Sequence, residues 1–232
     1  MVEEQEVVQL DKFDKVVTID GLAASGKSSV SRNLAKKLNF EWVSTGAFYR
    51  AIGLLCLRKE VNLADEEQVL AAFKNEDWQI VKDHERTQVF IDGKDATEQI
   101  YQEAVGTAAS NISVHTKIRK AILQAQRDCL TEKGLVAEGR DCGSVIFPSA
   151  GLKIFLVADP VKRAQRRAIQ EGLDPNEVLQ VQKQRDKRDS IRIEAPTVAP
   201  EGSITLDTSE YSLEEVVEKI YALAQKKFDI VP

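Results

Sequence analysis

A glycine loop constrains the fold of this chain more than any other feature of its sequence. The loop consists of Gly21, Leu22, Ala23, Ala24, Ser25, Gly26, Lys27 and Ser28, and it fits the pattern G-x-x-x-x-G-K-[ST]. The apolar run 15–20 before it predicts a buried strand, and apolar residues at helical spacing from Val30 to Leu38 predict a helix after it. A chance match in a glycine-bearing turn is the alternative, and these two flanking elements argue against it.

A loop of this kind binds phosphate groups. Its glycines allow successive backbone N–H groups to turn toward phosphate oxygens, and the helix N-terminus adds partial positive charge. We expect Lys27 to contact the β- and γ-phosphates of a nucleotide and the Ser28 hydroxyl to ligate Mg²⁺. Ser29 follows at the start of the helix, so residues 21–29 form the predicted ATP site. The loop alone does not identify the acceptor of the phosphoryl group.

The composition is that of a folded protein from a reducing compartment. The 232 residues are 43% hydrophobic and 30% charged, enough for one α/β domain with insertions. A net charge of −5 argues against a broad basic face for nucleic acid. No apolar run approaches the ~18 residues of a membrane span, and the acidic N-terminus lacks a signal-peptide profile. Cys56, Cys129 and Cys142 have neither disulfide nor zinc spacing, so we expect a cytoplasmic protein without nucleic-acid or membrane partners.

The remainder of the chain alternates between strands and helices. Apolar runs predict strands at 40–43, 135–137, 152–158 and 204–206. Helical spacing and capping residues predict helices at 47–59, 102–113, 116–132 and 160–171, and further helices that begin near Asp65, at Asp174-Pro175 and at a Ser212–Glu215 capping box. A small β patch at 76–98, with Asp92-Gly93 as a hairpin turn signal, interrupts this alternation. Such an insertion is either a substrate lid or a surface hairpin.

Arginines bracket the predicted helical hairpin at 160–192. Arg163 and Arg167 lie on its first helix, and Arg185, Arg188 and Arg192 lie near its end. A charge run is ordinarily a solvated helix face. Beside a phosphate loop it has another use, because phosphoryl transfer needs cations and the planar arginine fork meets phosphate oxygens in two places. A hairpin of this kind can close over a triphosphate and exclude water.

Several segments together resemble bacterial cytidylate kinase. They are the runs at 18–21 and 26–28, 44–50 (STGAFYR), 108–110, 138–141 within EGRDCGSVIFP, 153–156, and 185–189 within RDKRDSIR. The resemblance covers residues 14–228, and the longer runs are much more specific than the glycine loop. It implies a P-loop nucleoside monophosphate kinase fold, with a five-stranded parallel sheet flanked by helices. The implied parts are a core (14–72, 103–158 and 201–232), a β-containing monophosphate-binding insertion (73–102), a helical lid (159–200) and an arm (1–13).

The resemblance also implies an activity and a set of site residues. The reaction is phosphorylation of CMP and dCMP by ATP with Mg²⁺. The residues implied to bind cytosine are Ser110, Arg119 and Asp141. Those implied to bind the acceptor phosphate are Arg50, Arg140 and Arg192, with Thr45 beside them and Asp189 at the ribose hydroxyls. Those implied to neutralise the moving phosphoryl are Lys27, Arg140, Arg163 and Arg167, with Arg185 or Arg188.

The chemistry of cytosine agrees with this set. Its exocyclic amine donates beside the N3 and O2 acceptors, so Asp141 can accept while Arg119 and Ser110 donate. Uracil reverses the donor–acceptor sense at the amine and at N3, so cytosine should be favoured by ~2 kcal/mol or more. The alternative roles are a helix-terminal hydroxyl for Ser110, a surface arginine for Arg119 and a loop cap for Asp141. His84 and His115 lie in no motif, and transfer between phosphates needs no general base.

One departure from the family pattern lies at Ser44-Thr45, where the family commonly has an acidic residue followed by serine. This change removes a carboxylate from the acceptor side of the site. A kinase for UMP, AMP, shikimate or dephospho-coenzyme A is the alternative within the same class. A regulatory P-loop NTPase or a nucleotide-binding adaptor is the alternative outside it. No separate acidic strand with a residue for a hydrolytic water is evident, which argues against the NTPase. We expect a monomer.

Overall fold

A parallel sheet with β1 (Val16–Gly21) at its centre organises the chain. The computed structural model describes residues 13–82, 87–190 and 197–230. The strand order is β2-β6-β1-β7-β8, and all four pairings are parallel. The other strands are β2 (Glu41–Ser44), β6 (Leu135–Gly139), β7 (Leu152–Val157) and β8 (Ile204–Asp207). The predicted five-stranded parallel sheet is confirmed. The connection from β1 leads to β2 on one side, and the connection from β6 crosses to β7 on the other side of β1, which puts a ligand crevice at the carboxyl end of β1.

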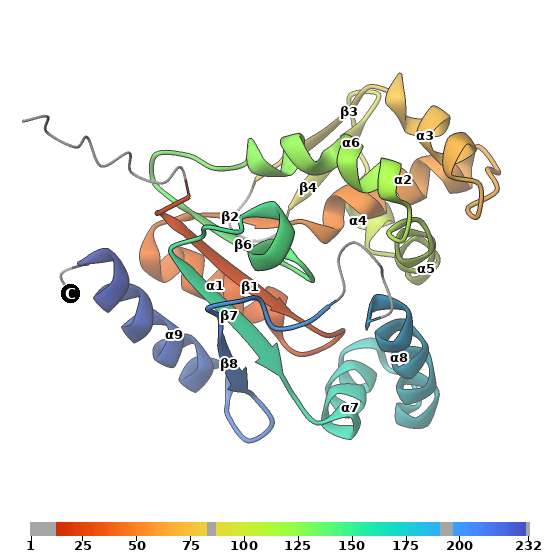
Figure 1. Cartoon of the computed structure of the whole chain (residues 1–232). Helices are drawn as coiled ribbons and strands as arrows, with labels where there is room; N and C mark the ends of the chain where they lie inside the picture. The colour runs from red at the N-terminus through yellow and green to blue at the C-terminus, as the bar shows by residue number, and fades with distance from the viewer. Residues whose placement is uncertain (1–12, 83–86, 191–196, 231–232) are drawn as a thin grey trace, which may run out of the picture.

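Helices cover both faces of this sheet, because successive strand residues point to opposite faces. Val17, Trp42 and Val136 pack in one cluster with α1 (Lys27–Leu38) and α9 (Leu213–Phe228). Val16 and Val43 belong to a larger cluster on the other face, as Figure 1 shows. The helices of that face are α2 (Gly46–Arg58), α3 (Glu66–Lys74), α5 (Glu103–Ile112) and α6 (Thr116–Arg127). The result is a three-layer α/β core.

The predicted helix ends are confirmed by their capping geometry. Asn39 ends α1 with a φ of 55°, and Gly172 ends α7 (Pro160–Glu171) with a φ of 67°. Asp65 accepts from two backbone N–H groups at the start of α3. The capping box of Ser212 and Glu215 is complete. The predicted helix 116–132 is wrong at its end, because α6 stops at Arg127 and residues 128–134 form a turn into β6.

The β patch forms an antiparallel sheet of three strands. They are β3 (Trp78–Val81), β4 (Gln88–Ile91) and β5 (Lys94–Asp95). The Asp92–Gly93 turn connects β4 to β5 with φ angles of 51° and 68°, as a tight hairpin requires. Neither β5, which has only two residues, nor the short α4 (Thr97–Ile100) after it was predicted from the sequence. Val89 and Ile91 are buried in the same cluster as α2.

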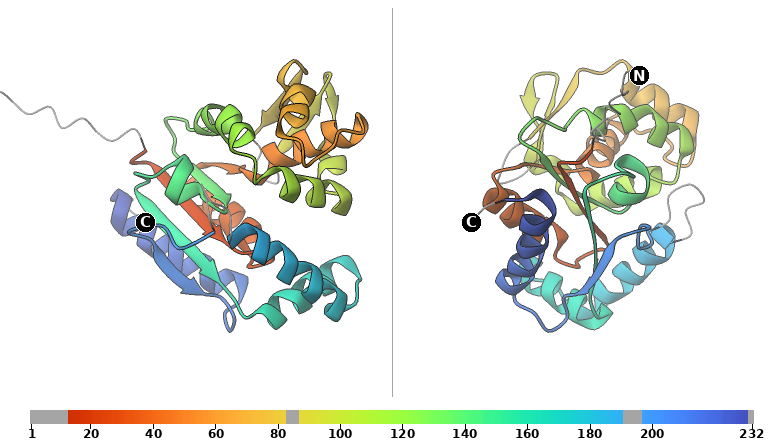
Figure 2. Two further views of the ribbon diagram at one scale, coloured as in Figure 1. Left: turned by 45° about the vertical axis from the view of Figure 1, so that its right-hand side comes forward. Right: turned by 60° about the vertical axis from the view of Figure 1, so that its left-hand side comes forward.

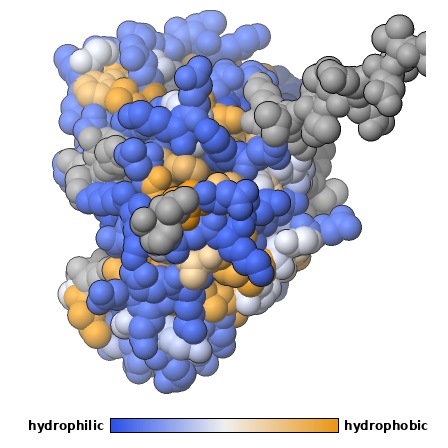
Figure 3. Space-filling model, turned by 90° about the vertical axis from the view of Figure 1, so that its left-hand side faces the viewer, coloured by the Kyte–Doolittle hydropathy of each residue, from blue (hydrophilic) through white to orange (hydrophobic). Residues whose placement is uncertain are grey.

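The charged hairpin of α7 and α8 (Pro175–Ser190) has a small core of its own. Ala164, Ala168 and Val178 form this core, and Asp159 caps α7 as predicted. In Figures 1 and 2 the hairpin lies beyond the carboxyl ends of β1 and β7, on the other side of the sheet end from α5. The face in Figure 3 is largely hydrophilic, with its hydrophobic side chains in separate small groups.

The N-terminal boundary differs slightly from the predicted one. Phe13 already belongs to the core, because its ring packs edge-on against Phe147 at 5.2 Å and under the guanidinium of Arg127. The remainder of the predicted arm lies outside the described residues. None of the helices within the described ranges is long and apolar enough to cross a membrane.

Candidate active site

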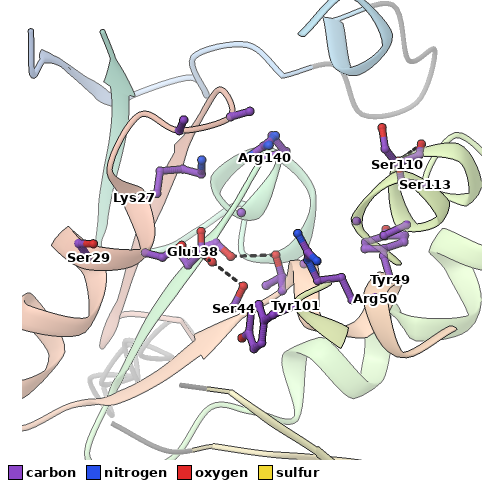
Figure 4. A pocket seen from close by; sticks show the side chains of 18 of the residues that line it. Lys27, Ser29, Ser44, Tyr49, Arg50, Tyr101, Ser110, Ser113, Glu138 and Arg140 are labelled. Carbon is purple, nitrogen blue, oxygen red and sulfur yellow. Dashed lines mark hydrogen bonds between the residues drawn. The ribbon is translucent and has the colours of Figure 1, made fainter. Parts of the chain in front are cut away.

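A pocket of about 650 Å³ lies at the carboxyl ends of β1, β2 and β6. It runs from the glycine loop, past the ends of β2 and β6, to the facing sides of α2 and α5. In Figure 4, Lys27 and Ser29 lie at one end of the pocket and Tyr49 and Ser110 at the other, with Glu138 between them. Residues of the predicted phosphate loop and two of the predicted base-binding residues, Ser110 and Asp141, therefore line one continuous space.

The glycine loop needs both of its glycines for steric reasons. A Cβ on Gly21 would lie 2.3 Å from the carbonyl oxygen of Leu156 on β7, and Gly26 has a φ of 87°. Ala24 also has a positive φ of 55°, a conformation that costs about 1–2 kcal/mol for a residue with a Cβ. The Lys27 Nζ donates to the carbonyl oxygen of Leu22 at 2.7 Å, so the lysine lies over the loop that it is predicted to serve.

A carboxylate lies beside the predicted metal ligand. The Ser28 hydroxyl donates to Oε1 of Glu138 at 3.2 Å, and the Ser44 hydroxyl donates to the same oxygen. Glu138 is 6% exposed. Sequence reasoning missed this residue, because the predicted strand stopped at residue 137 whereas β6 continues through Gly139. The strand next to the loop, β6, therefore carries an acid at its carboxyl end. The signal was an acid directly after the apolar run Leu135-Val136-Ala137.

Thr45 and Arg50 occupy the middle of the pocket from the start of α2. Both the backbone N–H and the hydroxyl of Thr45 donate to the carbonyl oxygen of Glu138, at 2.9 and 3.0 Å, which ties α2 to β6. Arg50 donates to the carbonyl oxygen of Ile100 at 2.7 Å and lies 5.6 Å from the ring centroid of Tyr101. These contacts hold the cationic side chain at the pocket wall.

Two of the three residues predicted to bind cytosine, Ser110 and Asp141, line the far end of the pocket, and Arg119 contacts Asp141 from outside the pocket lining. Arg119 forms a buried ion pair with Asp141 and donates to the carbonyl oxygen of Ser113 at 3.2 Å. Their exposed fractions are only 9% and 4%. Ser110 lines the same pocket, and Arg119 also lies 5.8 Å from the ring centroid of Tyr49. The pocket therefore presents a carboxylate and a hydroxyl, and the guanidinium of Arg119 pairs with that carboxylate.

Arg140, the residue immediately before Asp141, points toward the phosphate loop. Its Nη1 donates to the carbonyl oxygen of Gly21 at 3.1 Å, and it lines the pocket. Arg140 thus lies between the predicted donor and acceptor sites.

The predicted lid arginines fall into separate environments. Arg167 lines the pocket and pairs with Glu103 of α5 at 2.7 Å. Arg163 is 2% exposed and donates to the carbonyl oxygen of Ala23 at 2.8 Å, and it also pairs with Asp186 at 2.8 Å. Arg163 therefore supports the phosphate loop from beneath. The predictions for the side chains of Arg185, Arg188, Asp189 and Arg192 lie outside the described residues.

A second buried acid lies directly under the glycine loop. Asp20 is fully buried, and this burial is the main reason why its pKa is raised from 3.8 to about 7. Hydrogen bonds from the backbone N–H groups of Gly143 and Cys142 lower the pKa, and the nearby charge of Asp141 raises it. The pKa of Asp20 is therefore higher in the folded state than in the unfolded state. Between about pH 4 and 7, its carboxyl group is protonated in the folded state and ionised in the unfolded state.

We expect this proton to make the protein less stable as the pH rises. Within that window the free energy of unfolding should fall by about 1.4 kcal/mol per pH unit because of Asp20 alone. Denaturant unfolding at about pH 5, 6 and 7 measures this slope, and the same series on Asp20→Asn removes the Asp20 contribution. Equal slopes for the two proteins would mean that Asp20 has no raised pKa.

Comparisons with known proteins identify the family of the chain. A sequence model described as cytidylate kinase matches residues 17–226. The cytidylate kinase of Bdellovibrio bacteriovorus is 46% identical over 213 residues, which cover 91% of this chain and 98% of that protein. That of Neisseria gonorrhoeae is 42% identical over 211 residues, covering 89% and 95%. An uncharacterized protein from Eubacterium ventriosum has a TM-score of 0.51 at 16% identity over 92% of this chain and 99% of that one, which shows the fold alone. The chain therefore belongs to the cytidylate kinase family.

Proposed function

We propose that the pocket holds ATP on the glycine loop and CMP or dCMP against α5, α6 and Asp141, and transfers the γ-phosphoryl directly between them. Phosphorylation of these nucleotides is the activity of the family to which the chain belongs. Asp141 carries the proposal, because its carboxylate lines the pocket and offers cytosine an acceptor, and a buried ion pair with Arg119 holds that carboxylate in place. The products are ADP and CDP or dCDP.

Mg²⁺ fits the donor side of this pocket. Ser28 and Glu138 offer a hydroxyl and a carboxylate oxygen, which are the ligands that Mg²⁺ prefers, and the two groups are hydrogen-bonded to each other. No cluster of three or more acidic, histidine or cysteine side chains that could hold a metal occurs in the described part of the chain. This agrees with Mg²⁺ bound by one or two protein groups together with substrate phosphates. When bound, the ion neutralises charge that develops on the phosphates.

The residues of the chain then orient and neutralise the reactants. Lys27 exchanges its contact with the loop carbonyl for the β- and γ-phosphates, and Arg140 lies where it can contact both nucleotides. Arg50 receives the acceptor phosphate. That phosphate is already ionised, so its oxygen attacks without a general base. Arginine contacts that strengthen as charge spreads over the moving phosphoryl lower the barrier.

Ser44 also has a place in this proposal. The family commonly carries an acid at this position, and here the Ser44 hydroxyl is hydrogen-bonded to Glu138 on the neighbouring strand. We propose that Glu138 supplies the negative charge at this point of the pocket. The change at Ser44 therefore leaves the acceptor side with a carboxylate, which comes from β6.

We also propose that the small sheet and the α7–α8 hairpin move as two covers over the bound nucleotides. The separate core of the hairpin supports this proposal, because a unit with its own core can shift without exposing that of the main sheet. The ion pair of Arg167 with Glu103 joins the hairpin to α5 across the pocket. We propose in addition that the protein acts as a cytoplasmic monomer. Its three buried thiols suit a reducing compartment.

The test is ADP release from ATP with Mg²⁺, with CMP, dCMP, UMP, AMP and shikimate offered separately. We expect rapid turnover with CMP and dCMP, weak turnover with UMP, and almost none without an acceptor. Preference for AMP or shikimate would leave the phosphate loop assignment intact and overturn the cytosine site. Rapid hydrolysis without an acceptor would favour a regulatory NTPase.

A further inference from the structure

Asp20 lies at the junction of the two halves of the pocket but has no part in the binding of either nucleotide as proposed above. It is the residue before Gly21, its side chain is fully buried, and its strand is the centre of the sheet. A buried carboxylate is costly unless its oxygens accept hydrogen bonds. The contacts that compensate this cost show what the side chain does.

Both oxygens of Asp20 accept from the loop that carries the predicted base-binding acid. Oδ1 accepts from the backbone N–H of Cys142, and Oδ2 accepts from that of Gly143, both at 2.8 Å. These N–H groups belong to the first two residues of η1 (Cys142–Ile146), a single π-helical turn. The first N–H groups of a helical segment have no acceptor within it, so Asp20 supplies the missing acceptors. The carboxylate therefore joins the end of β1 to the residues immediately after Asp141.

The same loop is held on its other side by Arg140. Its guanidinium donates to the carbonyl oxygen of Gly21, the residue after Asp20. The dipeptide of Arg140 and Asp141 is thus bracketed by hydrogen bonds to two consecutive residues at the start of the phosphate loop.

Close packing leaves the loop little freedom to adopt another position. A Cβ on Gly139 would lie 2.3 Å from Oγ1 of Thr45, and one on Gly143 would lie 2.7 Å from Oγ1 of Thr18. The two glycines flank the Arg140–Asp141 dipeptide on the sequence. The loop therefore fits against β1 and α2 in one arrangement, and the Asp20 hydrogen bonds select its orientation.

We propose that Asp20 is a positioning residue that fixes Arg140 and Asp141 relative to the phosphate loop, and so aligns the acceptor nucleotide with the donor. The inference rests on the proposed acceptor site at Arg119 and Asp141. It assigns to β1 a function besides that of leading into the glycine loop: the strand sets the separation between the two substrates.

Asp20→Asn tests this role. At about pH 8, above the Asp20 pKa of about 7, the amide is the same size as the carboxylate but turns one acceptor into a donor, which faces a backbone N–H group. Because a displacement of about 1 Å can cost about 100-fold, we expect kcat/KM for CMP to fall by about 100-fold. The preference for CMP over UMP should fall by about tenfold, while KM for ATP stays within about threefold.

Thr18→Val is the matched control. Thr18 lies two residues earlier on the same strand face, is equally buried, and its hydroxyl has no hydrogen-bond partner among the described residues. The substitution keeps the shape of the side chain, so all kinetic constants should stay within about twofold. Amide hydrogen exchange at Cys142 and Gly143 supplies a second measurement, since Asp20→Asn should accelerate it and Thr18→Val should not.

A second variant covers the case in which Asp20→Asn folds poorly. Gly143→Ala displaces the same loop through its contact with Thr18 and leaves Asp20 intact, so it should give the same loss of base preference. Unchanged CMP preference in both folded variants would overturn the positioning role. A separate result would overturn the proposed cytosine site itself: equal turnover of UMP and CMP by the wild-type enzyme, or a ratio of CMP to UMP turnover that Asp141→Ala leaves unchanged.

Discussion

Replacing Asp141 with alanine is expected to lower kcat/KM for CMP by about 1,000-fold, which corresponds to about 4 kcal/mol. The carboxylate is 4% exposed and is the group that we expect to accept from the cytosine amine. Its loss also leaves the guanidinium of Arg119 buried without its ionic partner. Breaking a buried pair in this way destabilises a fold by about 3–5 kcal/mol, so the melting temperature should fall as well.

Steady-state kinetics with CMP, dCMP and UMP, on protein shown to be folded by circular dichroism, measure this effect. Asp128→Asn is the control, because it changes an exposed acid at the end of the helix that carries Arg119. Its kinetics should equal those of wild type. A variant Asp141→Ala that is folded and retains most of its CMP turnover would contradict the base-binding role.

Asp141→Asn sharpens the same prediction. An asparagine amide can donate to uracil O4, where the wild-type carboxylate would face another acceptor. The ratio of kcat/KM for CMP to that for UMP should therefore fall by about 100-fold or more, with UMP turnover itself maintained or raised. A fall in both activities with an unchanged ratio would mean that Asp141 acts through the fold alone.

Much of this site could be predicted from the sequence because its parts have local signals. The glycine loop has a fixed spacing, and the close approach of Leu156 to Gly21 and the positive φ of Gly26 explain why those two positions carry glycine. Asp65, Asn39 and Gly172 end or begin helices through contacts within a few residues. Such short-range geometry can be read from neighbouring residues alone. The α/β class followed from the alternation of strands and helices along the chain.

The parts that sequence reasoning missed depend on contacts across the sheet. The predicted strand 135–137 ended one residue before Glu138. The contacts of Glu138 with Ser28 and Ser44 exist only because β6 lies between β1 and β2 in the sheet. Arg163 and Arg167 look equivalent in sequence. One is buried under Ala23, whereas the other faces the pocket. Tertiary neighbours, which no spacing rule supplies, decide each of these cases.

Replacing Glu138 with glutamine is expected to lower kcat by about 1,000-fold with little change in KM for CMP. The Oε1 atom that accepts from Ser28 and Ser44 is retained in glutamine, so the hydrogen bonds of the resting site can persist. What is lost is the negative charge beside the proposed Mg²⁺ position. The effect should therefore appear in the chemical step and in the Mg²⁺ concentration needed for half-maximal rate, which should rise.

Titration of the rate against Mg²⁺ at saturating ATP and CMP measures both changes. Glu41→Gln is the matched control, because Glu41 lies on the adjacent strand β2 at the opposite end of the sheet from the pocket, in register with Leu135. It should leave the rate and the Mg²⁺ dependence unchanged. If Glu138→Gln retained wild-type kcat and Mg²⁺ dependence, the carboxylate would serve only to bind the two serines. The negative charge that the family commonly has at position 44 would then have no replacement in this chain.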